Sequence, residues 1–147
     1  MDLETNVKLM IYTKIAQDAK IPDSSSVATD MNLSEEKIRE IFQTLAAKRL
    51  LVLEPENPSK IRMAPPFSGI ETPFRVDISD KSYYANCVWD AFGIAAALHQ
   101  DAIIFSSDGF TGESLILEVK DNKPTQSSYL AHFAVPAVQW WDDIIYT

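Results

Sequence analysis

Residues 85–99 read ANCVWDAFGIAAALH, and this stretch decides how the second half of the chain is organised. Asn86 belongs to the residue types that favour the position just before a helix. We therefore predict a helix over about Asn86 to Leu98. Cys87 and Asp90 stand three positions apart within it, so their side chains share one face of its first turn.

Cys87 is the only cysteine in the chain, and its predicted place is the first turn of this helix. Unpaired backbone N–H groups and the positive end of the helix dipole favour a thiolate there, so we expect the pKa of Cys87 to be lowered. A thiolate can bind a thiophilic metal or react with an electrophile. The alternative interpretation is that Cys87 is a small buried hydrophobic residue.

Asp90 also admits two interpretations. A carboxylate in the first turn of a helix often satisfies backbone N–H groups and the dipole, which would make it a structural residue. Burial beside aromatic walls such as Trp89 or Phe92 would instead raise the pKa of Asp90 by desolvation. The carboxyl group could then hold a proton for transfer to a departing carbanion.

With these residues in place, the stretch from Phe74 to Tyr146 resembles the alkylmercury lyase family, whose members carry a Cys-x-x-Asp pair in this context. The runs His132–Pro136 and Trp140–Ile144 are similar to the family's segment just upstream of a second cysteine. That cysteine has no counterpart in this sequence, whose last residue, Thr147, lies about where it would be expected.

The resemblance implies protonolysis of a carbon–mercury bond, in which thiolates coordinate the metal and an aspartate protonates the departing carbon. Cys87 and Asp90 match two of the three expected participants, as the mercury-binding and proton-donating residues. We hypothesise a lyase-like protein whose activity is reduced, altered or lost. The implied partners are organomercury compounds or other thiophilic small molecules, together with small cellular thiols. No resident cofactor is expected, since the soft metal ion is substrate and product.

His132 is a further candidate ligand. It lies in an apolar run, Tyr129–Val135, whose composition predicts a strand. With Cys87 and Asp90 it could complete a Cys/His/Asp metal site. The alternative is a structural histidine, because sequence spacing alone gives no evidence of contact among the three.

Strands are predicted on both sides of the central helix. Alternating apolar residues indicate a strand over 74–78, and two more are expected over 102–105 and 115–119. Pro136 suits the first turn of a short helix that carries the two tryptophans after it. Residues 67–147 are thus expected to form a mixed domain of antiparallel strands and helices.

The first 66 residues predict three helices and a hairpin, the order of a winged helix-turn-helix. Ser34 is expected to open the third helix, and Ser24–Ser26 to cap the second. Two prolines and a glycine at 64–69 interrupt both periodicities, so we place a boundary between regions 1–66 and 67–147. The predicted fold class is α+β.

Charge limits the possible partners. Residues 1–70 hold nine Lys and Arg against ten Asp and Glu, whereas residues 71–147 hold four against eleven. A surface that neutralises phosphates needs an excess of cations, so the sequence argues against DNA as a partner. The apolar runs are too short for a membrane helix and no signal peptide is evident, which predicts a cytoplasmic protein without a membrane partner.

A second functional class remains open at this point. The same architecture would suit a winged-helix transcriptional regulator that senses a ligand or a metal. Its recognition helix would lie over residues 34–48, where Glu35, Glu36 and Glu40 stand beside Lys37 and Arg39. This mixture repels phosphates as much as it attracts them, which favours a structural role for the motif.

Overall fold

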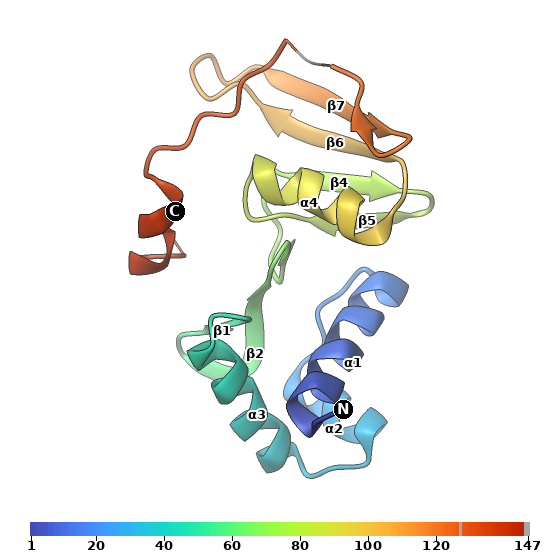
Figure 1. The fold of residues 1–147 in the computed structure, drawn as a ribbon, viewed down its shortest axis with the longest axis vertical. Helices are drawn as coiled ribbons and strands as arrows, with labels where there is room; N and C mark the ends of the chain where they lie inside the picture. The colour runs from blue at the N-terminus through green and yellow to red at the C-terminus, as the bar shows by residue number, and fades with distance from the viewer. Residues whose placement is uncertain (127, 146–147) are drawn as a thin grey trace.

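The computed structural model describes residues 1–126 and 128–145 and confirms the α+β class (Figure 1). The chain begins with three helices, followed by a small antiparallel sheet of order β1-β2-β3. The predicted order of three helices and a hairpin for residues 1–66 is confirmed. The elements are α1 (Leu3–Asp18), α2 (Ser24–Met31), α3 (Glu35–Ala47), β1 (Val52–Glu54), β2 (Asn57–Ala64) and β3 (Phe67–Ser68).

Each of the first three helices begins at a side-chain oxygen that accepts a backbone N–H. Ser34 accepts from the N–H of Lys37 at 3.2 Å, as predicted for the start of α3. The predicted cap of α2 is wrong, because Asp23 accepts from the N–H of Ser26 at 2.9 Å and Ser24 is already helical. Asp and Ser are comparable helix caps, so residue preference alone does not distinguish Asp23 from the serines that follow it.

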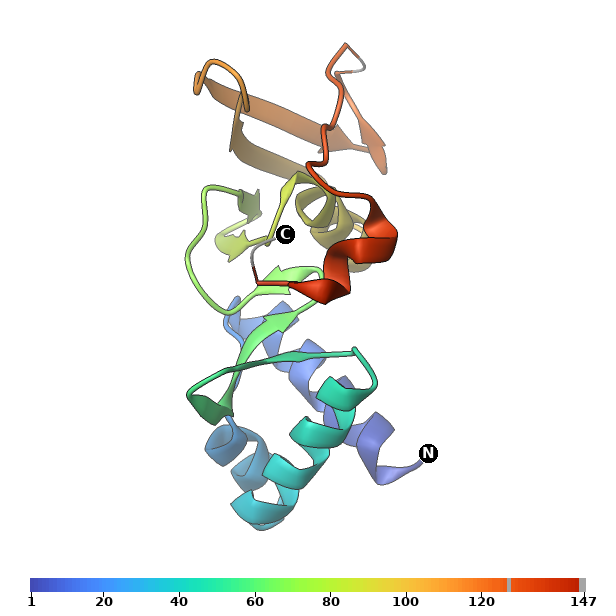
Figure 2. The same ribbon diagram turned by 90° about the vertical axis from the view of Figure 1, so that its left-hand side faces the viewer.

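The second half of the chain forms a five-stranded sheet of order β5-β4-β6-β7-β8, with every neighbouring pair antiparallel. Helix α4 packs against strands β4 and β6 and covers one face of the sheet (Figures 1 and 2). The elements are β4 (Arg75–Ile78), β5 (Lys81–Tyr84), α4 (Val88–Leu98), β6 (Ala102–Ser107), β7 (Ser114–Lys120), β8 (Lys123–Pro124) and the 3-10 helix η1 (Ala137–Asp142).

The prediction of a strand over Tyr129–Val135 is wrong. These residues have no regular secondary structure, and all but Val135 are exposed. A strand needs a neighbouring ladder to satisfy its backbone groups, and strand propensity alone does not provide one. The segment instead leaves the sheet and runs back towards the first region (Figure 1).

One hydrophobic core extends across the two regions. Phe67 lies between Tyr12 of α1 and Tyr83 of β5, with ring centroids 6.3 Å and 5.7 Å away. The Tyr83 hydroxyl donates to the carbonyl of Ala16 at 3.0 Å, and the Tyr12 hydroxyl donates to the carbonyl of Pro65 at 2.8 Å. Side chains from both sides of the proline-rich segment therefore pack together around Phe67.

None of the helices in the described part of the chain is both long enough and apolar enough to cross a membrane.

Candidate functional site at the start of helix α4

The N-cap of helix α4 lies one residue later than predicted. Cys87, and not Asn86, is its N-cap, with extended backbone angles of φ −152° and ψ 178°. The carbonyl of Cys87 accepts the first helical hydrogen bond, from the N–H of Ala91 at 3.0 Å. Its side chain makes no capping hydrogen bond, so the sulfur lies at the helix start without closing it.

The expected lowering of the Cys87 pKa is wrong. The side chain is half-buried, and burial raises the pKa of the thiol because the thiolate would lose its hydration. The nearby Asp90 carboxylate raises this pKa further, whereas backbone N–H groups of Asp90 and Trp89 would favour an ionised sulfur and partly oppose the shift. Cys87 is therefore mainly a thiol at neutral pH.

Asp90 lies in the first turn of α4 and is half-buried. Burial raises the pKa of its carboxyl group, the direction expected of a proton donor, and a hydrogen bond from Asn86 partly offsets the shift. The Asn86 side-chain amide donates to Asp90 Oδ2 at 3.2 Å. Asn86 thus orients Asp90, a role that sequence reasoning missed, although an Asn–Asp pair four positions apart at a helix start is a recognisable signal.

Close packing fixes α4 against the proline-rich segment. A Cβ atom added at Gly93 would stand 3.1 Å from Cβ of Pro66, so the absence of a side chain permits this approach. Asp90 precedes Gly93 by three residues and shares its helix face. The Asp90 face of α4 is therefore turned towards Pro66, where contact with protein replaces part of its hydration.

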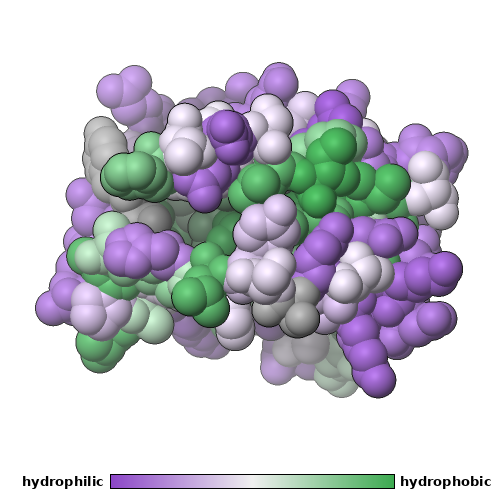
Figure 3. Space-filling model, turned by 90° about the horizontal axis from the view of Figure 1, so that it is seen from above, coloured by the Kyte–Doolittle hydropathy of each residue, from purple (hydrophilic) through white to green (hydrophobic). Residues whose placement is uncertain are grey.

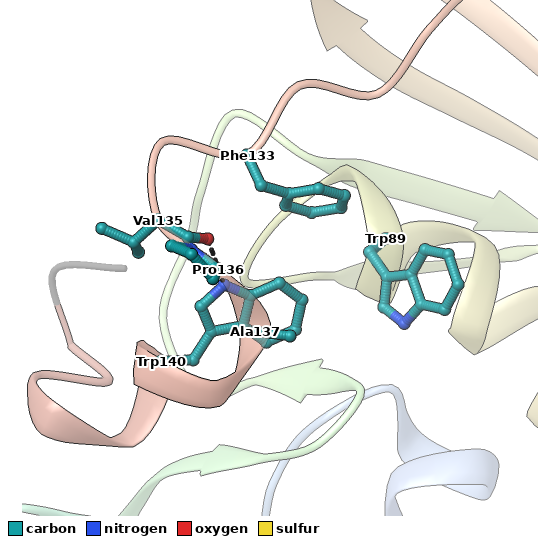
Figure 4. A pocket seen from close by; sticks show the side chains of 6 residues that line it. All are labelled: Trp89, Phe133, Val135, Pro136, Ala137 and Trp140. Atoms are coloured by element: carbon teal, nitrogen blue, oxygen red, sulfur yellow. Dashed lines mark hydrogen bonds between the residues drawn. The ribbon is translucent and has the colours of Figure 1, made fainter.

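Trp89 contributes to a separate cavity of about 400 Å³ on another side of α4, here called the aromatic cavity. Its walls also include Phe133 and Trp140 from the C-terminal segment (Figure 4). The Phe133 ring lies 6.4 Å from Trp89 and 5.3 Å from Trp140 between centroids. The Trp140 indole N–H donates to the carbonyl of Val135 at 3.0 Å, which holds the short helix in place.

His132 does not join the cysteine–aspartate pair. It is exposed and lines a larger cavity of about 720 Å³ between the sheet, α4 and the C-terminal segment, here called the sheet cavity. Among residues 1–126 and 128–145, no three His, Cys, Asp or Glu side chains are gathered closely enough to hold a metal ion. The structure therefore does not assemble the three-residue set of Cys87, Asp90 and His132. The predicted strand that would have carried His132 is not formed.

The sequence and the fold are similar to known proteins. The family model described as alkylmercury lyase matches residues 67–147. Among solved structures, the crystal structure of the mercury-bound form of MerB2 is similar, with a TM-score of 0.68 at 20% sequence identity. That similarity covers 87% of this chain and 61% of the other, so the present chain spans less than two thirds of its length. No curated protein matches the sequence.

Proposed function

Because the chain belongs to the alkylmercury lyase family, we propose that it binds organomercury compounds through Cys87 and cleaves their carbon–mercury bond with a proton from Asp90. One observation carries the proposal. The only sulfur nucleophile in the chain and a half-buried carboxyl group with a raised pKa occupy the same helix start, and the charge of one affects the ionisation of the other. Perturbed groups paired in this way are typical of catalytic sites.

In the first proposed step, Cys87 captures the organomercury cation. The sulfur forms a bond to mercury, and the proton of the thiol leaves to solvent. The soft metal ion prefers sulfur to water or carboxylate ligands, so the capture proceeds although burial disfavours the free thiolate. The product is a neutral adduct in which mercury bridges Cys87 and the organic group.

In the second step, Asp90 gives its proton to the carbon bonded to mercury. The electron pair of the carbon–mercury bond forms the new carbon–hydrogen bond, and the hydrocarbon leaves. Mercury(II) remains on the Cys87 sulfur, and the Asp90 carboxylate balances its charge. A raised pKa supports this role, because a larger fraction of Asp90 carries a proton near neutral pH than an ordinary carboxyl group does. Asn86 keeps Asp90 oriented through both steps.

The chain supplies one sulfur to this reaction. Mercury(II) bound to a single thiolate needs a second soft ligand, so we propose that a small thiol from solution provides it and carries the metal away. Turnover should then rise steeply with the concentration of added thiol. The proposed reaction uses no resident cofactor.

The test uses phenylmercury and a small thiol such as glutathione. Intact-protein mass spectrometry should show one phenylmercury group on the wild type and none on Cys87→Ser. Headspace detection of benzene should show release that increases with thiol concentration in the wild type only. Benzene release that persists in Cys87→Ser would remove the thiol from the mechanism. An intact adduct with no benzene at any thiol concentration would support a ligand- or metal-sensing regulator in place of a lyase.

A further inference from the structure

The sheet cavity lies apart from the residues of the proposed reaction. Its volume of about 720 Å³ lies in the range of roughly 300–1,000 Å³ typical of small-molecule pockets. Seen from above, this end of the molecule presents hydrophobic side chains around a hollow, bordered by hydrophilic ones (Figure 3). Neither Cys87 nor Asp90 lines the sheet cavity.

The floor of the sheet cavity is apolar. Val88 and Phe92 stand one turn apart on α4 and line it from one side. Leu115 and Leu117 alternate along β7 and line it from the sheet, because residues two apart on a strand share a face. Phe74 completes this surface. Leu117 is already buried, at 6% exposed, whereas Leu115 is only half-buried and can be covered further by another apolar group.

The rim of the sheet cavity is polar. Ser106, Ser107 and His132 contribute hydroxyl and imidazole groups to this rim. The lining residues include Asp108 and, within the part of the chain that the structure describes, no Lys or Arg. Asp108 Oδ1 accepts the N–H groups of Thr111 and Phe110 at 2.7 Å and 2.9 Å, which lowers the pKa of Asp108 and keeps it ionised at neutral pH.

We propose that the sheet cavity binds an uncharged small molecule with an aromatic or branched-alkyl body and a single hydroxyl or amide end. The body would pack against Leu115 of β7, and the polar end would contact the serine hydroxyls and His132. A carboxylate or phosphate is disfavoured, because it would lose hydration beside the Asp108 carboxylate without gaining a cation. This site is independent of the proposed mercury chemistry.

The test uses N-phenylnaphthylamine, a neutral dye whose emission rises in apolar surroundings. The full chain should bind it saturably, with one molecule per chain, and Cys87→Ser should bind it equally well. Naphthol should displace the dye at a concentration about tenfold lower than naphthoate, its carboxylate counterpart. Absence of saturable binding, or equal displacement by the two competitors, would overturn the proposal without affecting the lyase hypothesis.

Neighbouring residues of β7 provide a matched pair of variants. Leu115 faces the sheet cavity, whereas Ile116 points to the opposite face and is 62% exposed. Leu115→Glu should weaken dye binding about tenfold or more by placing a charge in the apolar floor, and Ile116→Glu should leave it unchanged. Urea unfolding of both variants checks that each is folded. Equal effects of the two substitutions would show that the dye binds elsewhere.

Discussion

The helices of the first region and helix α4 begin in different ways. Helices α1, α2 and α3 start at Asp2, Asp23 and Ser34, whose side-chain oxygens accept backbone N–H groups at 2.8 Å, 2.9 Å and 3.2 Å. Helix α4 starts at Cys87, whose side chain makes no such bond. An oxygen cap contributes about 1 kcal/mol to the stability of a helix, and α4 does without it.

This difference shows that α4 is stabilised in another way than the helices of the first region. Helix α4 keeps its place through burial of Ala91, Ile94 and Ala95 rather than through its cap. The start of α4 lacks a side-chain cap but carries Cys87 and the half-buried Asp90. Departures from the usual stabilising pattern of a helix are expected at functional sites. The helices of the first region are capped conventionally, and their buried side chains belong to the common core.

The largest expected effect comes from the acid of α4. Asp90→Asn should lower benzene release from bound phenylmercury by about 10²- to 10⁴-fold, because the amide has no proton of suitable acidity to give. Phenylmercury binding, measured by mass spectrometry, should stay close to that of the wild type. Glu36→Gln changes an exposed acid in the first turn of α3 and should leave both unchanged. Equal release from Asp90→Asn and wild type would make Asp90 a structural residue.

The next effect concerns pH. Burial raises the pKa of Cys87, so the rate of thiol alkylation should increase about tenfold per pH unit and reach its midpoint above the roughly 8.5 of a free cysteine. Benzene release should depend on pH in the opposite sense, since Asp90 loses its proton as pH rises through its own raised pKa. An alkylation midpoint below that of free cysteine would show that the helix start dominates over burial.

A smaller effect is expected from exchanging the caps. Ser34→Ala should lower the free energy of unfolding by about 1 kcal/mol, because the N–H of Lys37 loses its acceptor. Cys87→Ser should raise the stability by up to about 1 kcal/mol, since a hydroxyl at this position can cap α4. Urea unfolding of the two variants measures both changes. Destabilisation by Cys87→Ser as large as that by Ser34→Ala would mean that the sulfur already supports the helix.

The smallest expected effect is on DNA. Lys37 of α3 pairs with Glu40 at 2.9 Å, and Lys48 at the end of α3 pairs with Glu4, so these two cations are engaged within the protein. We predict no salt-dependent binding of duplex DNA tighter than the non-specific range of about 10⁻⁴ to 10⁻⁶ M at physiological salt. Fluorescence anisotropy of a labelled duplex measures this. Tighter, salt-dependent binding would favour the regulator over the lyase.

Much of the fold could be predicted from local patterns. The four apolar residues expected on one face of α3 are all buried: Ile38, Ile41, Phe42 and Leu45. Apolar residues repeated at helical spacing lie on the side of the helix that faces the core. The strands β4, β6 and β7 were also expected. The strand β5 was missed, since in Lys81–Tyr84 only Tyr83 is buried and the pattern is too short to read. Two-residue strands such as β3 and β8 are defined only by their partners.

The site could be predicted only in part, because burial depends on distant residues. The shared face of Cys87 and Asp90 follows from their spacing, whereas the direction of the Cys87 pKa shift does not. Helix position favours the thiolate, but burial of the side chain and the adjacent Asp90 carboxylate raise the pKa of Cys87 and decide the balance. The segment Tyr129–Val135, which carries His132, has the composition of a strand but pairs with no other strand among the described residues. Local sequence cannot show whether a pairing partner is present.

The positions of the tryptophans around the aromatic cavity also determine which parts of the protein their fluorescence reports on. All three tryptophans of the chain, Trp89, Trp140 and Trp141, lie in residues 67–147, and two of them wall this cavity. Trp141 contacts the first region, where its ring lies 5.7 Å from the guanidinium of Arg49. Indole emission therefore reports on the start of α4 and the C-terminal segment, while changes confined to α1 and α2 are best followed through far-ultraviolet circular dichroism.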